Sequence, residues 1–175
     1  MIARDLTGSG KTFAFGLPMV EYLRRYRHLG SRRVQAICLA PTRELAIQVT
    51  NEIAKLKHYE NEFRLVTVYG GVNIEEQTRQ LKNGVDIFIG TTGRVMDHME
   101  RGNIDFTDLK TIVLDEADQM LKLGFKEDID RILSRIKKEA DMNKLQICLF
   151  SATIPTWVKQ LARQYMKHYR VVDLA

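Results

Sequence analysis

Residues 7–12 read Thr-Gly-Ser-Gly-Lys-Thr, and apolar residues at helical spacing follow them directly. Glycines let successive backbone N–H groups turn inward around phosphate oxygens, and a helix that begins there directs its positive end at the phosphates. In such a loop Lys11 pairs with the β- and γ-phosphates, and the Thr12 hydroxyl helps to hold Mg²⁺. We therefore predict a nucleotide-binding loop at the start of a helix. Its residues are Thr7, Gly8, Ser9, Gly10, Lys11 and Thr12.

Two residues near this loop depart from a regular pattern. Asp5 stands where the usual loop has Gly or another small residue, and its carboxylate repels phosphate unless it points outward. Pro18 lies within the expected helix and should kink it. The alternative interpretation of residues 7–12 is an ordinary glycine-rich turn that contains a Lys-Thr pair by coincidence. The expected helix is lined by Phe13, Leu17, Val20 and Leu23.

Apolar, β-rich segments alternate with segments of helical periodicity over the rest of the chain. The apolar runs are almost continuous, which is typical of a parallel sheet with helices on both faces. The sequence therefore predicts an α/β domain with a mostly parallel sheet. Strands are expected at 34–39, 65–68, 86–89, 111–114, 145–150 and 170–173, and residues 1–4 resemble the end of another. Buried helix faces are expected from Leu45, Val49, Ile53 and Leu56, from Phe125, Ile129, Ile132, Leu133 and Ile136, and from Trp157, Leu161 and Tyr165.

The composition suits one ordinary globular domain. A chain of 175 residues can bury a core, and its apolar and charged fractions argue against a disordered or fibrous protein. The net charge of +5 permits nucleic-acid binding without establishing it, and no apolar run approaches the roughly 20 residues that span a membrane. Cys38 and Cys148 lie in apolar segments, as core thiols in a reducing compartment do. The histidines have no metal-ligand spacing, and we expect them on the surface: His28, His58, His98 and His168.

A second polar motif, Asp115-Glu116-Ala117-Asp118, follows the apolar run at 111–114. A carboxylate at the carboxyl end of a parallel strand faces the sheet edge at which a phosphate loop also lies. We expect Asp115 to hold Mg²⁺ through water, and Glu116 to orient and deprotonate the attacking water. The catalytic candidates are thus Glu116, Asp115 and Lys11. The alternative is an acidic first turn of a helix, where Asp and Glu are favoured.

The chain has the sequence D-E-A-D at 115–118, about a hundred residues after the loop at 7–12. In this combination it resembles the DEAD-box family of superfamily 2 RNA helicases. Residues 41–46 match the family's PTRELA motif, and Gly70-Gly71 matches its GG motif. The run Thr91-Thr92-Gly93-Arg94 is similar to TPGR, with Thr92 in the place of the proline, and residues 151–153 match SAT. Six motifs in the family's order cover nearly the whole chain. Residues 149–174 most resemble the nucleolar RNA helicase II (Gu) branch.

This resemblance implies a RecA-like P-loop NTPase domain that uses ATP and Mg²⁺. It implies hydrolysis coupled to unwinding of RNA duplexes or remodelling of RNA–protein complexes, with RNA held by backbone contacts that are largely independent of sequence. The residues alone leave ordinary turn and cap chemistry as the alternative at the RNA motifs. RNA binding is implied for Pro41, Thr42, Arg43, Gly70, Gly71, Thr91, Gly93 and Arg94. Coupling to a second domain is implied for Asp118, Ser151 and Thr153.

The resemblance also bears on domain organisation and location. We expect residues 1–175 to form one domain, the first RecA-like domain, truncated at its N-terminus, because no adenine-reading Q motif precedes Thr7. The second helicase domain, with the arginines that complete ATP hydrolysis, is expected to be absent, so this stretch alone should be nearly inactive. The location implied is intracellular, and nuclear or nucleolar if the branch resemblance holds, with no membrane contact.

Two other classes of function compete with an RNA helicase. A DNA-directed superfamily 2 motor shares the phosphate loop and an acidic box, although the intact PTRELA and DEAD motifs speak against it. A non-catalytic module that holds RNA or a protein is the other alternative, and it is suggested by Asp5 and by the truncation. ATPase activity that is stimulated by RNA but not by DNA would distinguish an RNA helicase from the DNA-directed motor. Nucleotide titration would distinguish it from the non-catalytic module.

Overall fold

The central strands of the sheet are short and mostly buried, as expected for apolar runs covered by helices on both faces, whereas the edge strand at 171–173 is exposed. The computed structural model describes residues 1–5, 10–26 and 33–174. Within them a seven-stranded sheet has the order β3-β4-β2-β5-β6-β1-β7, and every pairing is parallel. The strands are β1 (Ile2–Arg4), β2 (Ala36–Ala40), β3 (Leu65–Val68), β4 (Ile87–Thr91), β5 (Thr111–Leu114), β6 (Gln146–Ser151) and β7 (Val171–Asp173).

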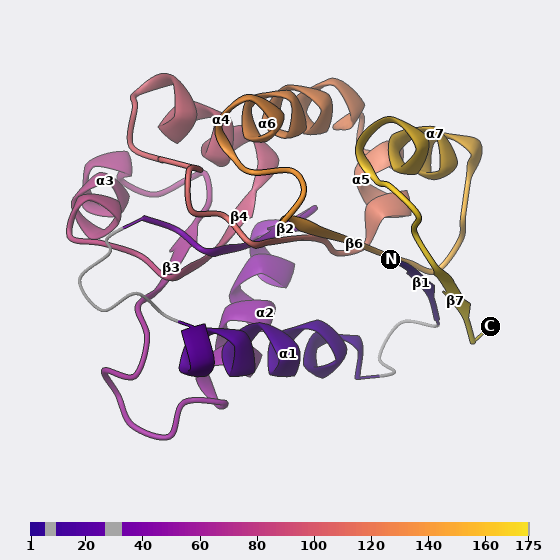
Figure 1. Cartoon of the computed structure of the whole chain (residues 1–175). Helices are drawn as coiled ribbons and strands as arrows, with labels where there is room; N and C mark the ends of the chain where they lie inside the picture. Colours follow the sequence, from indigo (N-terminus) through magenta and orange to yellow (C-terminus); the bar gives the residue numbers. More distant parts are fainter. Residues whose placement is uncertain (6–9, 27–32, 175) are drawn as a thin grey trace.

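Helices cover both faces of this sheet (Figure 1). One face carries α1 and α2, and the opposite face carries the other helices of the described chain. The parallel sheet with helices on both faces is therefore confirmed. The helices are α1 (Lys11–Tyr26), α2 (Arg43–Ala54), α3 (Ile74–Lys82), α4 (Thr92–Glu100), α5 (Ala117–Lys122), α6 (Lys126–Glu139) and α7 (Thr156–Tyr165).

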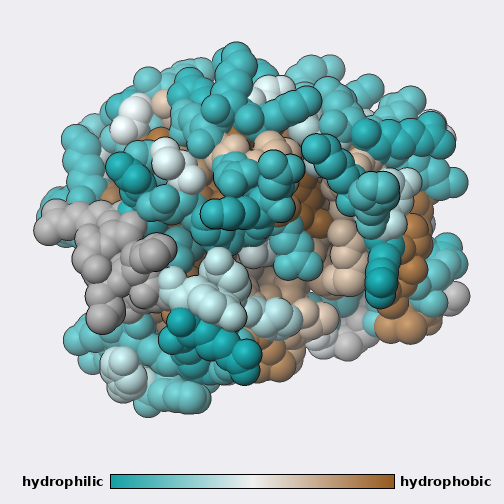
Figure 2. All heavy atoms as spheres, in the orientation of Figure 1, coloured by the Kyte–Doolittle hydropathy of each residue, from teal (hydrophilic) through white to brown (hydrophobic). Residues whose placement is uncertain are grey.

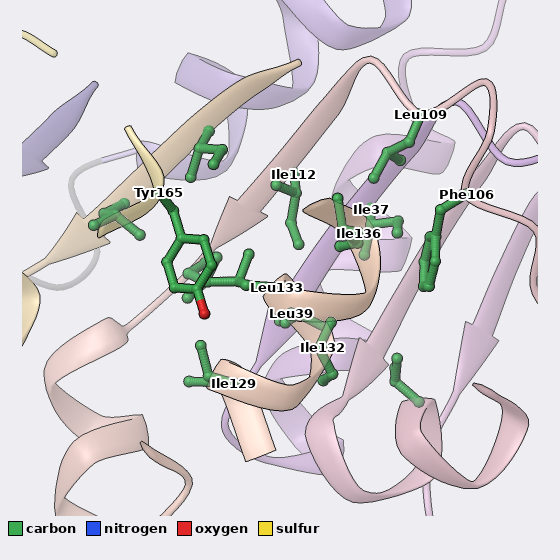
Figure 3. Close-up of a cluster of buried hydrophobic side chains, with 14 of the residues drawn as sticks. Ile37, Leu39, Phe106, Leu109, Ile112, Ile129, Ile132, Leu133, Ile136 and Tyr165 are labelled. Carbon is green, nitrogen blue, oxygen red and sulfur yellow. The ribbon is translucent and has the colours of Figure 1, made fainter. Parts of the chain in front are cut away.

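The core divides into two layers because neighbouring residues of a strand point to opposite faces. Along β2, Ile37 and Leu39 join one layer, whereas Ala36, Cys38 and Ala40 join the other. Figure 3 shows the first layer, in which α6 packs its isoleucines over Ile37 and Leu39. The predicted apolar faces of α2, α6 and α7 are confirmed.

The predicted face of α1 is partly wrong. Val20 and Leu23 are buried, but Phe13 and Leu17 are 39% and 49% exposed. The helix rests instead on Gly16, where an added Cβ would lie 3.4 Å from Leu56 Cδ1. The side of α1 that contains Gly16 therefore packs against Ile53 of α2 and against Leu56, which follows that helix. The residues buried beside Gly16 are Phe15 and Met19.

The helix also continues through Pro18, which lies on its exposed side. Proline removes the N–H that would bond the carbonyl four residues earlier, and on a solvent-facing side water can replace that bond. The expected disturbance at Pro18 therefore does not end α1.

The expectation of surface histidines is wrong for His98, which is fully buried, whereas His58 and His168 are exposed. His28 lies outside the described residues. Both cysteines are buried core thiols, as predicted, and burial raises the pKa of each. In the described part of the chain, no helix combines the length and apolar character needed to cross a bilayer.

The surface in the view of Figure 2 is mostly hydrophilic. Apolar surface shows on the side where the edge strand β7 lies, and Val171, Val172 and Leu174 are exposed there.

Candidate functional site

The predicted motifs meet at one edge of the sheet because all strands run in the same direction. Each motif begins where a strand ends. Asp115 follows β5, Pro41 follows β2, Thr91 closes β4, and Ser151 closes β6. The carboxyl edge of an open parallel sheet is the usual place for a ligand site. The strand order therefore brings together motifs that are far apart in sequence.

The described part of the phosphate loop places its lysine beside the acidic motif. Gly10 has φ 81°, which favours glycine, and Lys11 and Thr12 begin α1. The Lys11 Nζ lies 3.5 Å from the Glu116 Oε1, and these side chains are only 10% and 11% exposed. Thr7, Gly8 and Ser9 lie outside the described residues. The observed ion pair places an ammonium group where the sequence predicts nucleotide phosphates.

Asp115 is a buried carboxylic acid that lacks a partner for one oxygen. Its Oδ1 makes no hydrogen bond in the structure. The pKa of Asp115 is raised to about 6, mainly by burial and also by the charge of Glu116, while Lys11 acts in the opposite direction. An ionised carboxylate in such a place requires a cation or a donor. Asp115 therefore fits a role in holding a hydrated divalent cation, together with the half-buried Thr12 hydroxyl.

Glu116 has a left-handed backbone conformation, with φ 56° and ψ 47°. This conformation is uncommon for a residue other than Gly, Asn or Asp, and it costs about 1–3 kcal/mol. It turns the chain from β5 into α5 within one residue, so that Asp115 and Glu116 are both buried at the sheet edge. We call Lys11, Asp115 and Glu116 the carboxylate cluster. Strain and an unpaired buried oxygen in one place are typical of functional sites.

The three residues predicted to couple domains bond to one another. The Thr153 hydroxyl donates to the Asp118 Oδ2 at 3.1 Å. The Asp118 backbone N–H donates to the Ser151 Oγ at 3.2 Å. Both hydroxyls of the SAT motif therefore contact the acidic motif: Ser151 accepts from the backbone of Asp118, and Thr153 donates to its carboxylate.

The PTRELA motif begins α2 with an N-cap. The Thr42 Oγ1 accepts from the Leu45 N–H at 3.2 Å, and Pro41 before it is buried. Arg43 is exposed, and its guanidinium lies 4.8 Å from the centre of the Tyr69 ring. When the flat guanidinium of an Arg stacks on an aromatic ring, its N–H groups point outward from the stack. They stay available to bond a phosphate. Arg43 is thus a preorganised cation at this edge.

Gly70 and Gly71 form an exposed turn beside Arg43. Gly71 has φ 80°, and an added Cβ would lie 3.5 Å from the Arg43 Nη1. A residue with a side chain would be strained there by the positive φ, and its Cβ would be in van der Waals contact with the guanidinium. The turn therefore allows a ligand to approach both the backbone and Arg43.

The run at 91–94 starts α4. Thr91 occupies the N-cap position, and Gly93 is exposed with open space around it. Thr92, in the place of the family's proline, is 1% exposed, and its Oγ1 has no hydrogen-bond partner. Arg94 is mostly buried at 12% exposure of its side chain. Its Nη1 donates to the Val72 carbonyl and to the Gln77 Oε1, each at 3.2 Å.

This placement separates the two predicted arginines. Arg43 is exposed, whereas Arg94 bonds groups of its own fold, and a direct phosphate contact by Arg94 stays a prediction. The sequence did not single out Gln77, His98 and Asn103, which a series of hydrogen bonds connects to Arg94. A usable signal was the four-residue spacing of Arg94 and His98, which places them on one side of a helix.

Comparison with known proteins supports the motifs. Residues 1–161 match the DEAD/DEAH box helicase family. The chain is 44% identical over 176 residues to DEAD-box ATP-dependent RNA helicase 9 of Oryza sativa subsp. japonica, over 99% of this chain and 27% of that protein. It is 42% identical over 178 residues to nucleolar RNA helicase 2 of Rattus norvegicus, over 99% of this chain and 22% of that protein. These similar values do not single out the nucleolar branch.

A solved structure shows the same fold. The crystal structure of a DEAD box protein from the hyperthermophile Methanococcus jannaschii has 40% identity and a TM-score of 0.86, over 99% of this chain and 45% of that one. The chain spans about a quarter of the length of the two relatives above. The expected RecA-like fold is confirmed. With a family match that takes in most of its residues, the chain belongs to the DEAD/DEAH box helicase family.

Proposed function

We propose that this domain binds ATP and, joined to a second helicase domain in cis, couples its hydrolysis to unwinding of RNA duplexes or remodelling of RNA–protein complexes. The observation that carries the proposal is the carboxylate cluster. An ammonium, a strained glutamate and an aspartate with an unpaired oxygen lie buried at the sheet edge where the phosphate loop begins. The names of the relatives, ATP-dependent RNA helicase and RNA helicase, support the same activity.

In this proposal each residue of the carboxylate cluster has a separate role in nucleotide binding or hydrolysis. Lys11 exchanges its contact with Glu116 for the β- and γ-phosphates, which frees the Glu116 carboxylate. Glu116 then orients the attacking water and accepts its proton. Asp115 and Thr12 hold Mg²⁺, which when bound neutralises charge on the phosphates. Thr7, Gly8, Ser9 and Gly10 surround the phosphates with backbone N–H groups.

RNA binding is proposed for the neighbouring part of the same edge. Arg43 supplies an exposed guanidinium, and Gly70-Gly71 and Gly93 let a sugar–phosphate backbone approach closely. Pro41, Thr42, Thr91 and Arg94 complete the set, and such contacts do not depend on base identity.

The hydrogen bonds of Asp118 with Ser151 and Thr153 support a coupling role rather than a chemical one, because neither hydroxyl contacts Glu116 in the bonds observed. We propose that these residues transmit the nucleotide state to the second domain. An intracellular place of action, nuclear or nucleolar, is part of the proposal, and it is supported by the name of the rat relative.

Replacing Glu116 with Gln in the full-length protein tests the proposal. Gln keeps the shape of Glu but cannot accept a proton, so RNA-stimulated single-turnover hydrolysis should fall roughly 10²–10⁴-fold, while ATP affinity stays close to that of the wild type. The matched control is Glu127→Gln, since Glu127 is an exposed acid in the first turn of α6.

Unchanged turnover in Glu116→Gln would show that Glu116 is only an acid at a helix start. Stimulation of the wild type by DNA rather than RNA would favour the DNA-directed motor. Nucleotide binding without any turnover would favour the non-catalytic module.

A further inference from the structure

A chain of buried polar side chains connects α3, α4 and the Gly70-Gly71 turn. Gln77 is 5% exposed and His98 is 0% exposed. The Gln77 Oε1 lies 3.1 Å from the His98 Nε2 and 3.2 Å from the Arg94 Nη1. The Asn103 Nδ2 lies 3.0 Å from the His98 Nδ1 and 3.1 Å from the Thr78 Oγ1. We call Gln77, Thr78, Arg94, His98 and Asn103 the α3–α4 network.

The donors and acceptors of this network can be assigned without conflict. The Thr78 hydroxyl donates to the Ile74 carbonyl at 3.0 Å, so its oxygen accepts from Asn103. The second N–H of the Asn103 amide then donates to the His98 Nδ1. The His98 Nε2 must therefore carry the proton, and it donates to Gln77. This assignment requires a neutral imidazole in one defined tautomer.

The backbone also holds Asn103 close to the Nδ1 edge of the His98 ring. Gly102 has φ 69°, and its N–H donates to the Met99 carbonyl at 3.1 Å. The Asn103 N–H donates to the His98 carbonyl at 2.9 Å. Together these bonds are a Schellman motif, which ends α4 and places Asn103 one turn below the histidine.

The other end of the network holds the Gly70-Gly71 turn on both sides. The Gln77 Nε2 donates to the Tyr69 carbonyl at 3.0 Å, immediately before the two glycines. The Arg94 Nη1 donates to the Val72 carbonyl at 3.2 Å, immediately after them. Glycines are the most flexible residues, and a turn containing two of them needs such external bonds to keep one conformation. Gln77 and Arg94 also bond to each other, so both sides of the turn are held by one connected pair of side chains, of which Arg94 lies on α4.

We propose that Gln77 and His98 are positioning residues for RNA binding: they hold the Gly70-Gly71 turn in a fixed place relative to the first turn of α4. The proposal rests on the RNA-binding function proposed above for these two segments. Neither side chain contacts RNA in this role, because both are buried. His98 acts through Gln77, and Gln77 acts through the carbonyl of Tyr69 and the guanidinium of Arg94.

The surroundings of His98 agree with a neutral ring. Burial lowers its pKa to about 4, with Arg94 and Arg101 lowering it and Asp97 raising it. From α3, Glu75 faces Arg101 at 3.0 Å. The ring therefore stays neutral, as the tautomer assignment requires, over the range in which the protein would bind RNA near neutral pH.

The test uses Gln77→Leu and the pair His98→Leu and His98→Gln in the full-length protein. Affinity for a fluorescent single-stranded RNA is measured by anisotropy, and affinity for a fluorescent ADP analogue serves as the internal control. Losing the bonds of one buried network residue should weaken RNA binding about tenfold in Gln77→Leu and in His98→Leu. His98→Gln offers Gln77 an N–H donor again, so it should recover most of the RNA affinity. ADP affinity should be unchanged in all three.

Tyr165→Phe is the matched control. It removes the hydroxyl that bonds Ser134 and Asp130, also in a helix–helix contact but between α6 and α7. Equal RNA affinity in Tyr165→Phe and Gln77→Leu would overturn the proposal, because the network would then matter only for stability. Equal loss in His98→Leu and His98→Gln would overturn it as well, and this pair decides the question if Gln77→Leu does not fold.

Arg43→Ala separates this proposal from the RNA-binding proposal beneath it. If Arg43→Ala and the network variants all bind RNA like the wild type, the RNA site itself is misplaced. If Arg43→Ala weakens binding and the network variants do not, the site is right and the positioning role is wrong. Nitrogen-15 shifts of the His98 ring provide a direct readout, and a protonated Nδ1 in the wild type at neutral pH would also overturn the proposal.

Discussion

The carboxylate cluster and the α3–α4 network are both buried and polar, yet they differ in how well their groups are satisfied. In the carboxylate cluster, Asp115 has an unpaired oxygen, and Glu116 is held in a left-handed conformation. In the α3–α4 network, Gln77, His98 and Asn103 each have partners in a consistent pattern of donors and acceptors.

This difference implies that the carboxylate cluster lowers the stability of the fold, whereas the α3–α4 network adds to it. A buried polar group that lacks a partner costs about 1–3 kcal/mol, and a fully satisfied network makes one conformation rigid. Under the proposed function, a bound cation would supply the partner that the Asp115 oxygen lacks, and this would offset the cost of burying that oxygen. The polar groups of the α3–α4 network are satisfied without a ligand, as expected if the network only positions the Gly70-Gly71 turn.

Lys11→Ala should give the largest effect on the carboxylate cluster and leave the α3–α4 network unchanged. The ammonium neutralises phosphate charge that backbone N–H groups offset only in part, and a hydrogen bond to a charged group contributes about 1.5–3 kcal/mol. Affinity for a fluorescent ADP analogue should fall roughly ten- to a hundredfold. The ring shifts of His98 should match the wild type. Equal ADP affinity in the variant would remove the phosphate-loop assignment.

The pH dependence of stability should have opposite signs in the two regions. The pKa of His98 is about 4 in the fold and 6.5 ordinarily, so the unfolded chain binds the proton more tightly. Its contribution is complete above pH 6.5 and is lost as the pH falls toward 4. The pKa of Asp115 rises from 3.8 to about 6, so the fold binds that proton more tightly. Its contribution falls as the pH rises through this range.

Asp115→Asn and His98→Gln separate these two effects in urea unfolding from pH 4 to 7 in metal-free buffer. Asp115→Asn should be more stable than the wild type at neutral pH by on the order of 2–3 kcal/mol, with a steeper rise of stability with pH. His98→Gln should show the shallower rise. Parallel curves for the two variants would contradict the contrast between the regions.

The smallest effect is expected at Thr92, the unsatisfied residue at the start of α4. Thr92 is the first residue of α4, and the N–H of a first helical residue has no partner within the helix, so proline is accepted there. Thr91 has φ −85° and ψ 147°, an extended conformation that is compatible with a following proline. Thr92→Pro should therefore raise the free energy of unfolding by about 1 kcal/mol, since it removes a buried hydroxyl without a partner. Thr92→Val removes the hydroxyl alone and should give part of that gain. A loss of stability in both variants would show that the Thr92 hydroxyl has a partner in solution.

Much of the fold and of the nucleotide site could be predicted because the signals are local. An apolar run such as 111–114 indicates a buried strand wherever it lies, and Asp115 after it must stand at the strand's carboxyl end. Gly10 and Lys11 before a helical segment likewise indicate a phosphate loop. These conclusions need neighbours only a few residues away, and β5 and the ion pair of Lys11 with Glu116 agree with them.

The rest depended on contacts between distant segments. The side of α1 that packs on the core contains Gly16, which contacts Leu56, and nothing near Phe13 in the sequence indicates that Phe13 stays exposed. His98 follows the buried Val95 by three residues, which places both on one side of α4. A histidine in that position does not by itself indicate burial, because its polar ring needs a partner such as Gln77, which lies on another helix.

The sequence by itself determined the chemistry of this protein: the phosphate loop, the acidic motif and the order of the helicase motifs along the chain. Only the tertiary structure decided that Arg43 faces solvent while Arg94 bonds the fold, and that a neutral His98 supports the Gly70-Gly71 turn through Gln77. The physical reason is that a residue type and its near neighbours specify which bonds a group can make. Packing of segments from different parts of the chain specifies which of those bonds it does make.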